Sequence, residues 1–324
     1  MIAPAVRGQI RPDPLLLDVP LTLSRTFYPL GYRLELTTNS VDVIDAATEC
    51  WGMMAVTFEC EAIRLRVIVQ EEGELAPDPV FRAQESLFAV IADRQNIATF
   101  DATTFSGFCF VTRATAAHHE WFRWNFLESI VYTMLSQRYV VPVHAALVAL
   151  DGTGVLLCGR SGAGKSTLAY ACAREGWTYV CDDATFLIPG TEVEGVGKSQ
   201  KVRFREDAPC WFPELSGYPA HLRPNGRLAI EPLTAGFPEL RTAFRAQIGL
   251  IAFLDRRIGP RAHSVPMAGS VAVESLLREM PLYHAPVNEF HESTVRQLLG
   301  VPAWRIFYRN PSEGVALLND LVQR

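Results

Sequence analysis

Residues 155–167 read VLLCGRSGAGKST, and this stretch decides the fold. It begins with an apolar run typical of a buried strand, continues with the spacing Gly-x4-Gly-Lys-Ser, and leads into the helix-forming sequence TLAYACA at 167–173. A strand, a glycine-rich loop and a helix in this order predict a phosphate-binding loop. The N–H groups of the loop and the positive end of the helix would face the phosphates of a nucleoside polyphosphate.

Individual residues of this loop have distinct expected roles. Lys165 is expected to reach the β- and γ-phosphates, and the hydroxyl of Ser166 to bind Mg²⁺. The chain has only 3 lysines but 27 arginines, so a lysine at this position is unusual for this protein. Its ammonium group supplies a compact positive charge, which the larger guanidinium group of arginine would not. The other predicted phosphate-binding residues are Gly159, Ser161, Gly162, Ala163, Gly164 and Thr167.

The composition excludes several classes of protein. A chain of 324 residues with 49% hydrophobic residues can bury a sizeable core and favours two domains. The formal net charge of −5 argues against nucleic acid as a partner. The 7 cysteines include no C-x2-C pair, no secretory signal precedes them, and no apolar run is long enough for a membrane helix. We expect a reduced, cytoplasmic protein that does not contact a membrane.

The hydrophobic patterns predict an α+β domain over 1–135 and an α/β domain over 136–324. In the second domain, 145–150 and 154–158 are expected to form a hairpin that turns at Asp151-Gly152, and 178–181 a further strand. Residues 189–201 and 206–226 are rich in glycine, proline or charge and are expected to be surface loops near the phosphates. An aromatic stripe that includes Trp121 and Trp124 predicts a core-facing helix, with nucleobase stacking as the alternative.

Two adjacent carboxylates follow the strand predicted at 178–181. Asp182 and Asp183 come 17 and 18 residues after Lys165, about the length of one helix and one strand. If this strand lies beside the strand at 155–158 and parallel to it, both end at the same edge of the sheet. One carboxylate could then bind Mg²⁺ while the other accepts a proton from an attacking hydroxyl. The alternative is an aspartate pair that only caps a turn.

His144 immediately precedes the hairpin strand at 145–150. A lone histidine beside an apolar strand is usually a structural residue. Its position near the phosphate-binding loop and the two aspartates favours an Asp–His pair instead.

These three segments together resemble a known family. The order VHAALV (143–148), GVLLCGRSGAGKSTLA (154–169) and GWTYVCDDA (176–184) is similar to the catalytic core of the bacterial HPr serine kinase/phosphorylase family. It is especially similar to the HPr-kinase-like proteins found in peptide-maturation operons and in uncharacterised operons. The resemblance implies an α/β fold whose P-loop core, with a mixed sheet, is of the HPr kinase/phosphoenolpyruvate carboxykinase type. It is strongest over 140–190 and weakest over 1–135.

The resemblance also implies residue roles. Asp182 would be the general base toward a substrate serine, assisted by His144, and Asp183 would lie near the metal with Ser166. The loop Asn225-Gly226-Arg227 is similar to one from which related proteins offer a cation, so Arg227 would stabilise the transferring phosphoryl group. Taken alone, Arg227 would be a solvated loop residue. Arg203 and Arg205 are weaker candidates because their alternation also fits an edge strand.

One departure narrows the expected activity. Family members carry an RGxGxxxV signature beyond the aspartate pair that is associated with the reverse reaction, whereas residues 190–205 read GTEVEGVGKSQKVRFR. We therefore expect a Mg²⁺- and ATP-dependent kinase that phosphorylates a hydroxyl, namely a serine of a small protein or peptide, and that could form a homo-oligomer. A kinase for a small metabolite, such as free serine or a sugar, and a nucleotide-sensing module without transfer are the alternatives.

Overall fold

The computed structural model describes residues 16, 18–224, 226–256 and 261–324. The chain divides into two compact units, one of residues 1–82 and 89–127 and the other of residues 83–88 and 128–324. The main boundary therefore lies between Leu127 and Glu128, whereas the sequence predicts it between residues 135 and 136.

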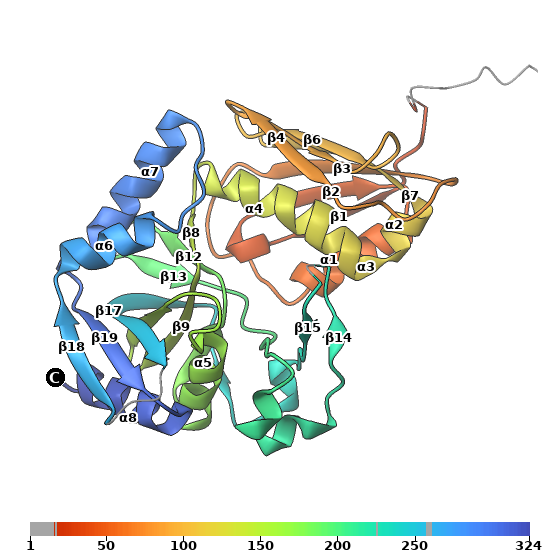
Figure 1. Ribbon diagram of the computed structural model, residues 1–324. Helices are drawn as coiled ribbons and strands as arrows, with labels where there is room; N and C mark the ends of the chain where they lie inside the picture. The colour runs from red at the N-terminus through yellow and green to blue at the C-terminus, as the bar shows by residue number, and fades with distance from the viewer. Residues whose placement is uncertain (1–15, 17, 225, 257–260) are drawn as a thin grey trace, which may run out of the picture. The chain divides into compact units, whose positions relative to one another are not determined.

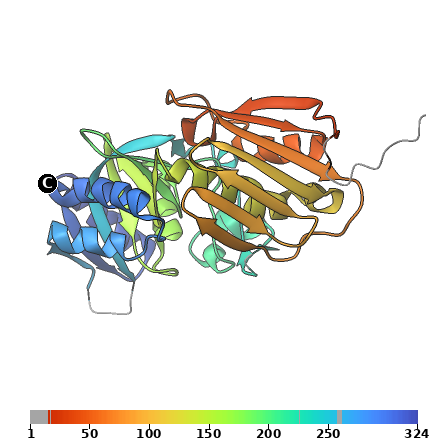
Figure 2. The same cartoon turned by 90° about the horizontal axis from the view of Figure 1, so that it is seen from above.

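Within the described part of the chain, the first sheet has seven strands in the order β1-β2-β3-β7-β6-β5-β4. The pairs β2–β3 and β3–β7 are parallel, and the pairs β1–β2 and β6–β7 are antiparallel. Figure 2 shows the strands side by side. The strands are β1 (Leu23–Phe27), β2 (Leu34–Thr38), β3 (Ile63–Gln70), β4 (Val80–Gln84), β5 (Leu87–Ile91), β6 (Ile97–Asp101) and β7 (Ser106–Thr112).

Three helices of this unit pack together on one face of the sheet (Figure 1). They are α1 (Val41–Trp51), α2 (Arg113–Ala117) and α3 (His119–Phe122), and the 3-10 turn η1 (Pro29–Gly31) precedes β2. The alternation of β3 directs Ile63, Leu65 and Val67 toward a core that also buries Trp51 of α1. The first unit is thus a sheet with one helix-covered face, as the α+β prediction requires.

The helix predicted around Trp121 and Trp124 is interrupted. A π-helical segment, η2 (Arg123–Glu128), separates α3 from α4 (Ser129–Ser136). Ile130, Val131 and Met134, which continue the apolar stripe into α4, are fully buried, but Trp124 is 39% exposed. The stripe therefore forms core over most of its length, and Trp124 does not belong to it.

The second unit contains a mixed sheet of ten strands among the described residues, in the order β16-β11-β9-β10-β17-β13-β12-β8, with β19 paired to both β17 and β18. Its strands are β8 (Val141–Val143), β9 (Ala145–Leu150), β10 (Thr153–Cys158), β11 (Thr178–Cys181), β12 (Thr185–Ile188), β13 (Glu194–Val196), β16 (Arg241–Thr242), β17 (Arg245–Arg256), β18 (His263–Met267) and β19 (Ala303–Tyr308). The mixed α/β architecture predicted for this part is confirmed.

The central hairpin forms as the sequence predicts. β9 and β10 are antiparallel, and the chain reverses at Asp151 (φ 49°) and Gly152 (φ 86°). Positive φ at both turn residues matches the right-handed twist of the flanking strands.

One expected neighbour relation is wrong. β10 and β11 are not adjacent, because β9 lies between them and is antiparallel to both. Two strands that are each antiparallel to a third run in the same direction. Cys158 and Cys181 therefore still end at the same edge of the sheet, as the argument for the site requires.

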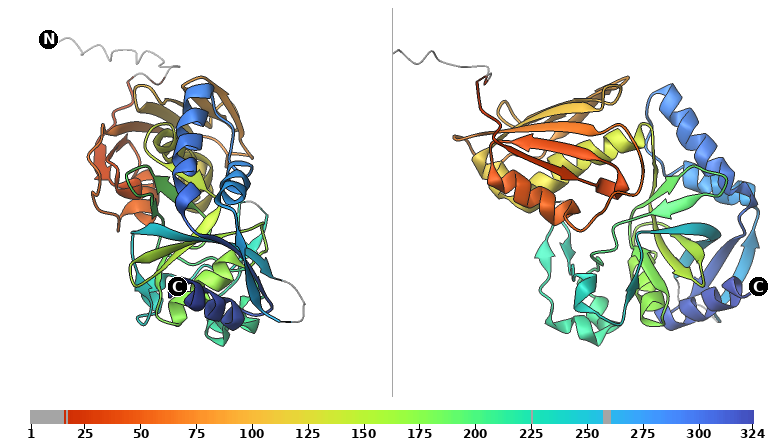
Figure 3. Two further views of the ribbon diagram at one scale, coloured as in Figure 1. Left: turned by 90° about the vertical axis from the view of Figure 1, so that its left-hand side faces the viewer. Right: turned by 180° about the vertical axis from the view of Figure 1, so that it is seen from behind.

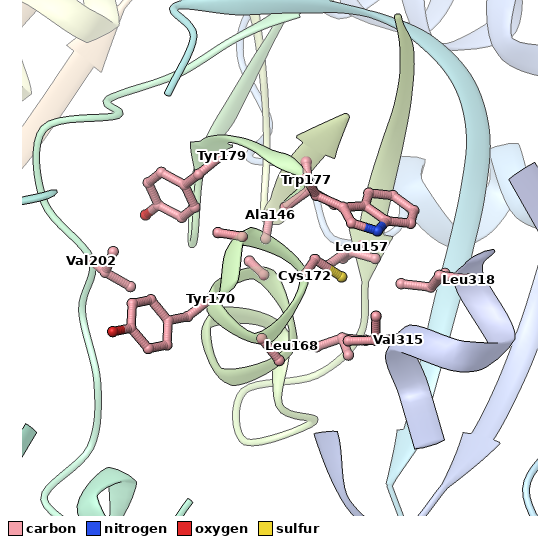
Figure 4. Close-up of a cluster of buried hydrophobic side chains, with 14 of the residues drawn as sticks. Ala146, Leu157, Leu168, Tyr170, Cys172, Trp177, Tyr179, Val202, Val315 and Leu318 are labelled. Carbon is pink, nitrogen blue, oxygen red and sulfur yellow. The ribbon is translucent and has the colours of Figure 1, made fainter. Parts of the chain in front are cut away.

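Both faces of this sheet are covered. Val155 and Leu157 of β10 face one core, with α5 (Lys165–Arg174) and α8 (Pro311–Val322), while Leu156 and Cys158 face a second core. The second core is covered by α6 (Gly269–Leu277), α7 (Ala285–Arg296) and the turn η6 (Gln297–Gly300). Figures 1 and 3 show the two helix pairs on opposite sides, and Figure 4 shows the core beside α5. Burial on both faces explains the continuous apolar run VLLC.

The two segments predicted as surface loops carry short elements. Residues 189–201 contain β13, which joins the large sheet. Residues 206–226 contain buried Phe212 and Leu215 and part of a two-stranded sheet. The elements of this region are η3 (Ala208–Cys210), η4 (Pro213–Gly217), β14 (His221–Leu222), β15 (Leu228–Ala229) and η5 (Thr234–Gly236).

Candidate active site

The predicted phosphate-binding loop, 159–164, connects the end of β10 to the start of α5. Gly164 has φ of +97°, and a Cβ atom there would lie 2.8 Å from Oη of Tyr308. Only glycine fits this backbone conformation without strain. The Tyr308 hydroxyl also donates to the carbonyl oxygen of Ala163 (3.1 Å). Tyr308 is the last residue of β19, so this strand helps to hold the loop in place.

Lys165 is the first residue of α5 and is almost fully buried, with 6% of its surface exposed. Its ammonium group donates to the carbonyl oxygen of Gly159 (2.7 Å), which turns the side chain back over the loop. Burial lowers the pKa of Lys165, while nearby Asp183 opposes this effect. The positive charge is thus held against the loop.

Ser166 joins the loop to the aspartate pair. Its hydroxyl donates to the backbone carbonyl oxygen of Asp182 at 3.4 Å. The carboxyl end of β11 and the start of α5 therefore meet, as the spacing in the sequence predicts.

The two aspartates occupy different environments. Asp182 has 8% of its surface exposed, and its Oδ2 accepts from the backbone N–H of Arg203 (2.7 Å). Burial raises the pKa of Asp182 to about 6, although Arg203 acts in the opposite direction. Asp182 thus lies beneath the surface of the site.

Asp183 points the other way. Its Oδ1 lies 3.0 Å from Nε2 of His144, and about half of each side chain is exposed. The hydrogen bond with His144 lowers the pKa of Asp183 to about 2, against the opposing effect of burial. The Asp–His pair predicted from the sequence is present, and it uses Asp183.

Three arginines surround the loop and the aspartates. Nη1 of Arg227 donates to the hydroxyl of Ser161 (3.2 Å), and a Cβ atom at Gly162 would lie 3.1 Å from Nη2 of Arg205. Arg203 lies between Asp183 (3.4 Å) and Glu231 (2.5 Å). Arg203 and Arg205, the weaker sequence candidates, are thus as close to the site as Arg227. Asn225 of the predicted cation loop lies outside the described residues.

These groups open into one cleft with a volume of about 200 Å³. Six of its lining residues are cationic, and Asp183 and Asp207 are its acids, so among the described residues the cleft is strongly positive. The sequence-predicted residues that line it are His144, Ser161, Gly162, Gly164, Lys165, Ser166, Thr167, Asp183, Arg203, Arg205 and Arg227. Three predicted residues that the structure describes, Gly159, Ala163 and Asp182, are not part of this lining.

Sequence reasoning missed several residues of the cleft. Arg223, Arg256, Trp211 and Asp207 line it, yet none lies in a recognisable motif. The density of arginine in 203–227 was the available signal. It identifies no individual residue, because exposed arginines are common on any surface.

Across the helices that the structure describes, none combines the length and the apolar character needed to cross a bilayer.

One comparison with known proteins matches the part of the chain that contains the phosphate-binding loop and the two aspartates. The family model described as SynChlorMet cassette protein ScmC matches residues 108–195, less than half of the chain. A protein of Fusobacterium nucleatum named "Putative HPr kinase/phosphorylase" is 42% identical over 80 residues. That match covers 25% of this chain and 12% of the relative, so the chain spans only about an eighth of the relative's length.

A solved structure gives a weaker similarity. The Hpr(Ser) kinase/phosphatase from Coxiella burnetii is 17% identical, with a TM-score of 0.32, over 56% of this chain and 96% of that chain. A TM-score of this size does not establish a common fold. The predicted resemblance to the HPr kinase/phosphorylase-like family is nevertheless confirmed by the named relative, over the stretch that the two chains share.

Proposed function

We propose that the cleft binds ATP with Mg²⁺ and transfers its γ-phosphoryl group to a hydroxyl, that of a serine in a small protein or peptide. One observation carries the proposal. Lys165, at the start of the helix that follows a glycine-rich loop, and the Asp183–His144 pair line the same cleft. Phosphoryl transfer needs both a cationic cradle for the phosphates and a group that orients the acceptor.

The cradle for the phosphates has two parts. The backbone N–H groups of 161–166 and the N-terminus of the ten-residue helix α5 favour anions. Lys165, Arg205 and Arg227 add side-chain charges around the same loop. Charge that accumulates on the phosphoryl oxygens during transfer would be stabilised by these preorganised cations.

The residues present also fit Mg²⁺. The Ser166 hydroxyl lines the cleft next to the backbone of Asp182, and hydroxyl and carboxylate oxygens are the ligands this ion prefers. Ser166 would hold the ion, and the negative charge of the buried Asp182 carboxylate would attract it electrostatically. When bound, Mg²⁺ would neutralise part of the negative charge of the phosphates.

We assign to Asp183 and His144 the role of accepting the proton from the hydroxyl that is phosphorylated. A base must first be within reach of the hydroxyl, and Asp183 lines the cleft whereas Asp182 is buried. This reverses the order expected from the resemblance. The hydroxyl oxygen forms a bond to the γ-phosphorus, the bond from phosphorus to the bridging oxygen breaks, and ADP leaves. The proton of the hydroxyl passes to the Asp183–His144 pair.

A protein acceptor is supported by the relative, whose name refers to a kinase and phosphorylase of the protein HPr. The Asp183–His144 pair in the cleft argues against a module that only senses nucleotide, because binding alone requires no proton acceptor. We therefore propose neither a metabolite kinase nor a sensor.

The test uses γ-labelled ATP, Mg²⁺ and a protein and peptide fraction of the source cells. Asp183→Asn should lower transfer about 100-fold or more while ATP binding by calorimetry stays unchanged. Lys165→Ala should instead weaken ATP binding itself. Wild-type protein that binds ATP but labels no protein or peptide would refute the proposed reaction.

Asp182→Asn separates the two possible orders of the aspartates. If Asp182 favours the metal, this variant should need a higher Mg²⁺ concentration for half-maximal transfer, with the maximal rate largely restored at saturation. The reverse assignment would be supported if Asp183→Asn showed that Mg²⁺ dependence and Asp182→Asn lost transfer at every Mg²⁺ concentration.

A further inference from the structure

The cleft is lined by Trp211, an aromatic residue that no motif identifies. Building on the proposed nucleotide binding, we infer that Trp211 and the cavity beside it hold the aromatic base of the bound nucleotide. The phosphates at 161–167 then fix one end of the ligand and Trp211 the other.

Trp211 lies at the edge of the cleft that contains the loop. It follows η3, lines the cleft together with Thr167 and Arg256, and is 36% exposed. Arg256 packs its guanidinium carbon 5.4 Å from the centre of the indole ring. The Arg256 side chain also lies next to the loop, because a Cβ atom at Gly164 would be 3.8 Å from its Cδ. The indole ring is therefore held close to the phosphate-binding loop.

A second cavity of about 200 Å³ shares Trp211 as a wall. Its other walls come from the last turns of α5, including Ala171 and Arg174, and from the start of α8, including Asn310 and Ser312. The indole ring therefore borders both cavities. Ala171 is six residues beyond Lys165, which places it roughly 9 Å farther along the helix axis. A ribose and one phosphate can span such a separation.

The chemistry of this cavity suits a nucleobase. An exposed indole ring offers a flat surface on which any base can stack, whatever its hydrogen-bonding edge. Phe212 and Val315 give the wall an apolar part, and Asn310 and Ser312 add an amide and a hydroxyl. A combination of apolar surface and a few polar groups can fix a ligand's orientation.

The two tryptophans that the sequence suggests for nucleobase stacking do not border these cavities. Trp121 and Trp124, both within the described residues, are absent from the lining of either cavity. Trp211 is therefore the tryptophan that the structure brings to the phosphate cleft, whereas the sequence draws attention to the other two.

The test compares MgATP with magnesium tripolyphosphate, which has the phosphates but no base, by calorimetry on the full chain. Trp211→Ala should weaken ATP binding about tenfold, which corresponds to about 1.4 kcal/mol, and leave tripolyphosphate binding unchanged. Trp211→Phe keeps an aromatic face and should restore most of the affinity. Trp124→Ala removes a tryptophan of similar exposure, 39%, and should change neither ligand.

A second variant tests the cavity without altering the ring. Ser312→Phe fills the space at the start of α8 and should weaken ATP but not tripolyphosphate. Unchanged ATP binding by Trp211→Ala, or equal weakening of both ligands, would overturn the inference. If wild-type protein bound tripolyphosphate as tightly as ATP, the inference about the base would be overturned but the proposed function would stand. If it bound neither ligand, the proposed function would be overturned as well.

Discussion

Arg203 connects the two aspartates to a carboxylate outside the cleft. Its backbone N–H donates to Asp182, and its guanidinium group lies between Asp183 and Glu231. Glu231 also pairs with Nε of Arg223 at 3.1 Å, so one carboxylate with 12% of its side chain exposed holds two guanidinium groups. We therefore interpret Glu231 as a positioning residue that acts on the aspartates through Arg203.

Glu231→Gln tests this interpretation. The variant leaves Arg203 and Arg223 without their shared negative charge, and we expect kcat to fall roughly tenfold, about 1.4 kcal/mol in activation free energy. The KM for ATP should change less, and Glu231→Asp should recover part of kcat. The measurement is steady-state kinetics of transfer, accompanied by a melting curve for each variant.

Glu194→Gln is the matched control, since Glu194 pairs with Arg245 (3.1 Å) in the same unit but does not line the cleft. Equal losses in the two variants, or a loss of kcat that merely follows a loss of folded protein, would contradict a positioning role.

The loop between β5 and β6 illustrates how a side chain supports an element. Oδ1 of Asp93 accepts from the backbone N–H groups of Gln95 (2.7 Å) and Asn96 (2.9 Å). Asn96 in turn accepts from the backbone N–H of Thr112 in β7 (3.0 Å). Burial acts to raise the pKa of Asp93, but these hydrogen bonds hold it below its usual value of 3.8. The charged carboxylate thus connects the loop to β7.

Asp93→Asn should lower the free energy of unfolding by roughly 1 kcal/mol at pH 7, because hydrogen bonds to a charged acceptor are stronger than those to a neutral one. The pKa is lower in the folded state, so this stabilisation is present above about pH 4 and is lost as the pH falls through the folded-state pKa. Urea unfolding at pH 7 and pH 3 measures it. Asp78→Asn, at an exposed aspartate in the same unit, should show no such difference, and a gap for Asp93→Asn that widens in acid would contradict the mechanism.

Over the whole molecule, the cleft collects segments far apart in the chain, from His144 to Arg256, within one unit. The loop that follows β10, Asp183 after β11, residues between 203 and 211, Arg223 and residues 227–229 line it. A ligand that binds there must therefore connect segments that lie up to about a hundred residues apart, and its binding should slow their exchange with solvent together.

Hydrogen–deuterium exchange of the full chain tests that expectation. MgATP should slow exchange of the amides of 159–167 and 203–211, and leave β2 and β3 in the first unit unchanged. Lys165→Ala should remove the protection. Protection confined to 159–167, with 203–211 exchanging as before, would mean that the second segment does not contact the nucleotide.

The local sequence pattern was sufficient to predict the helices and strands around the phosphate-binding loop. The hairpin β9–β10, the helix α5, the strand β11 and the aspartates behind it lie within about forty residues, and their apolar periodicity, turn chemistry and spacing are short-range properties. By contrast, the packing of α6 and α7 on the second face of the sheet depends on strands distant in sequence, and no short-range pattern predicts it.

The sequence by itself determined that a glycine-rich loop with Lys165 stands near two carboxylates and a histidine. Only the tertiary structure decided that β9 lies between β10 and β11, that Asp183 faces His144 while Asp182 is buried, and that Arg223, Arg256 and Trp211 join the same cleft. The physical reason is that neighbouring side chains at a strand end point to different sides, and which side is the cleft depends on long-range packing. Distant arginines carry no pattern until folding brings them together.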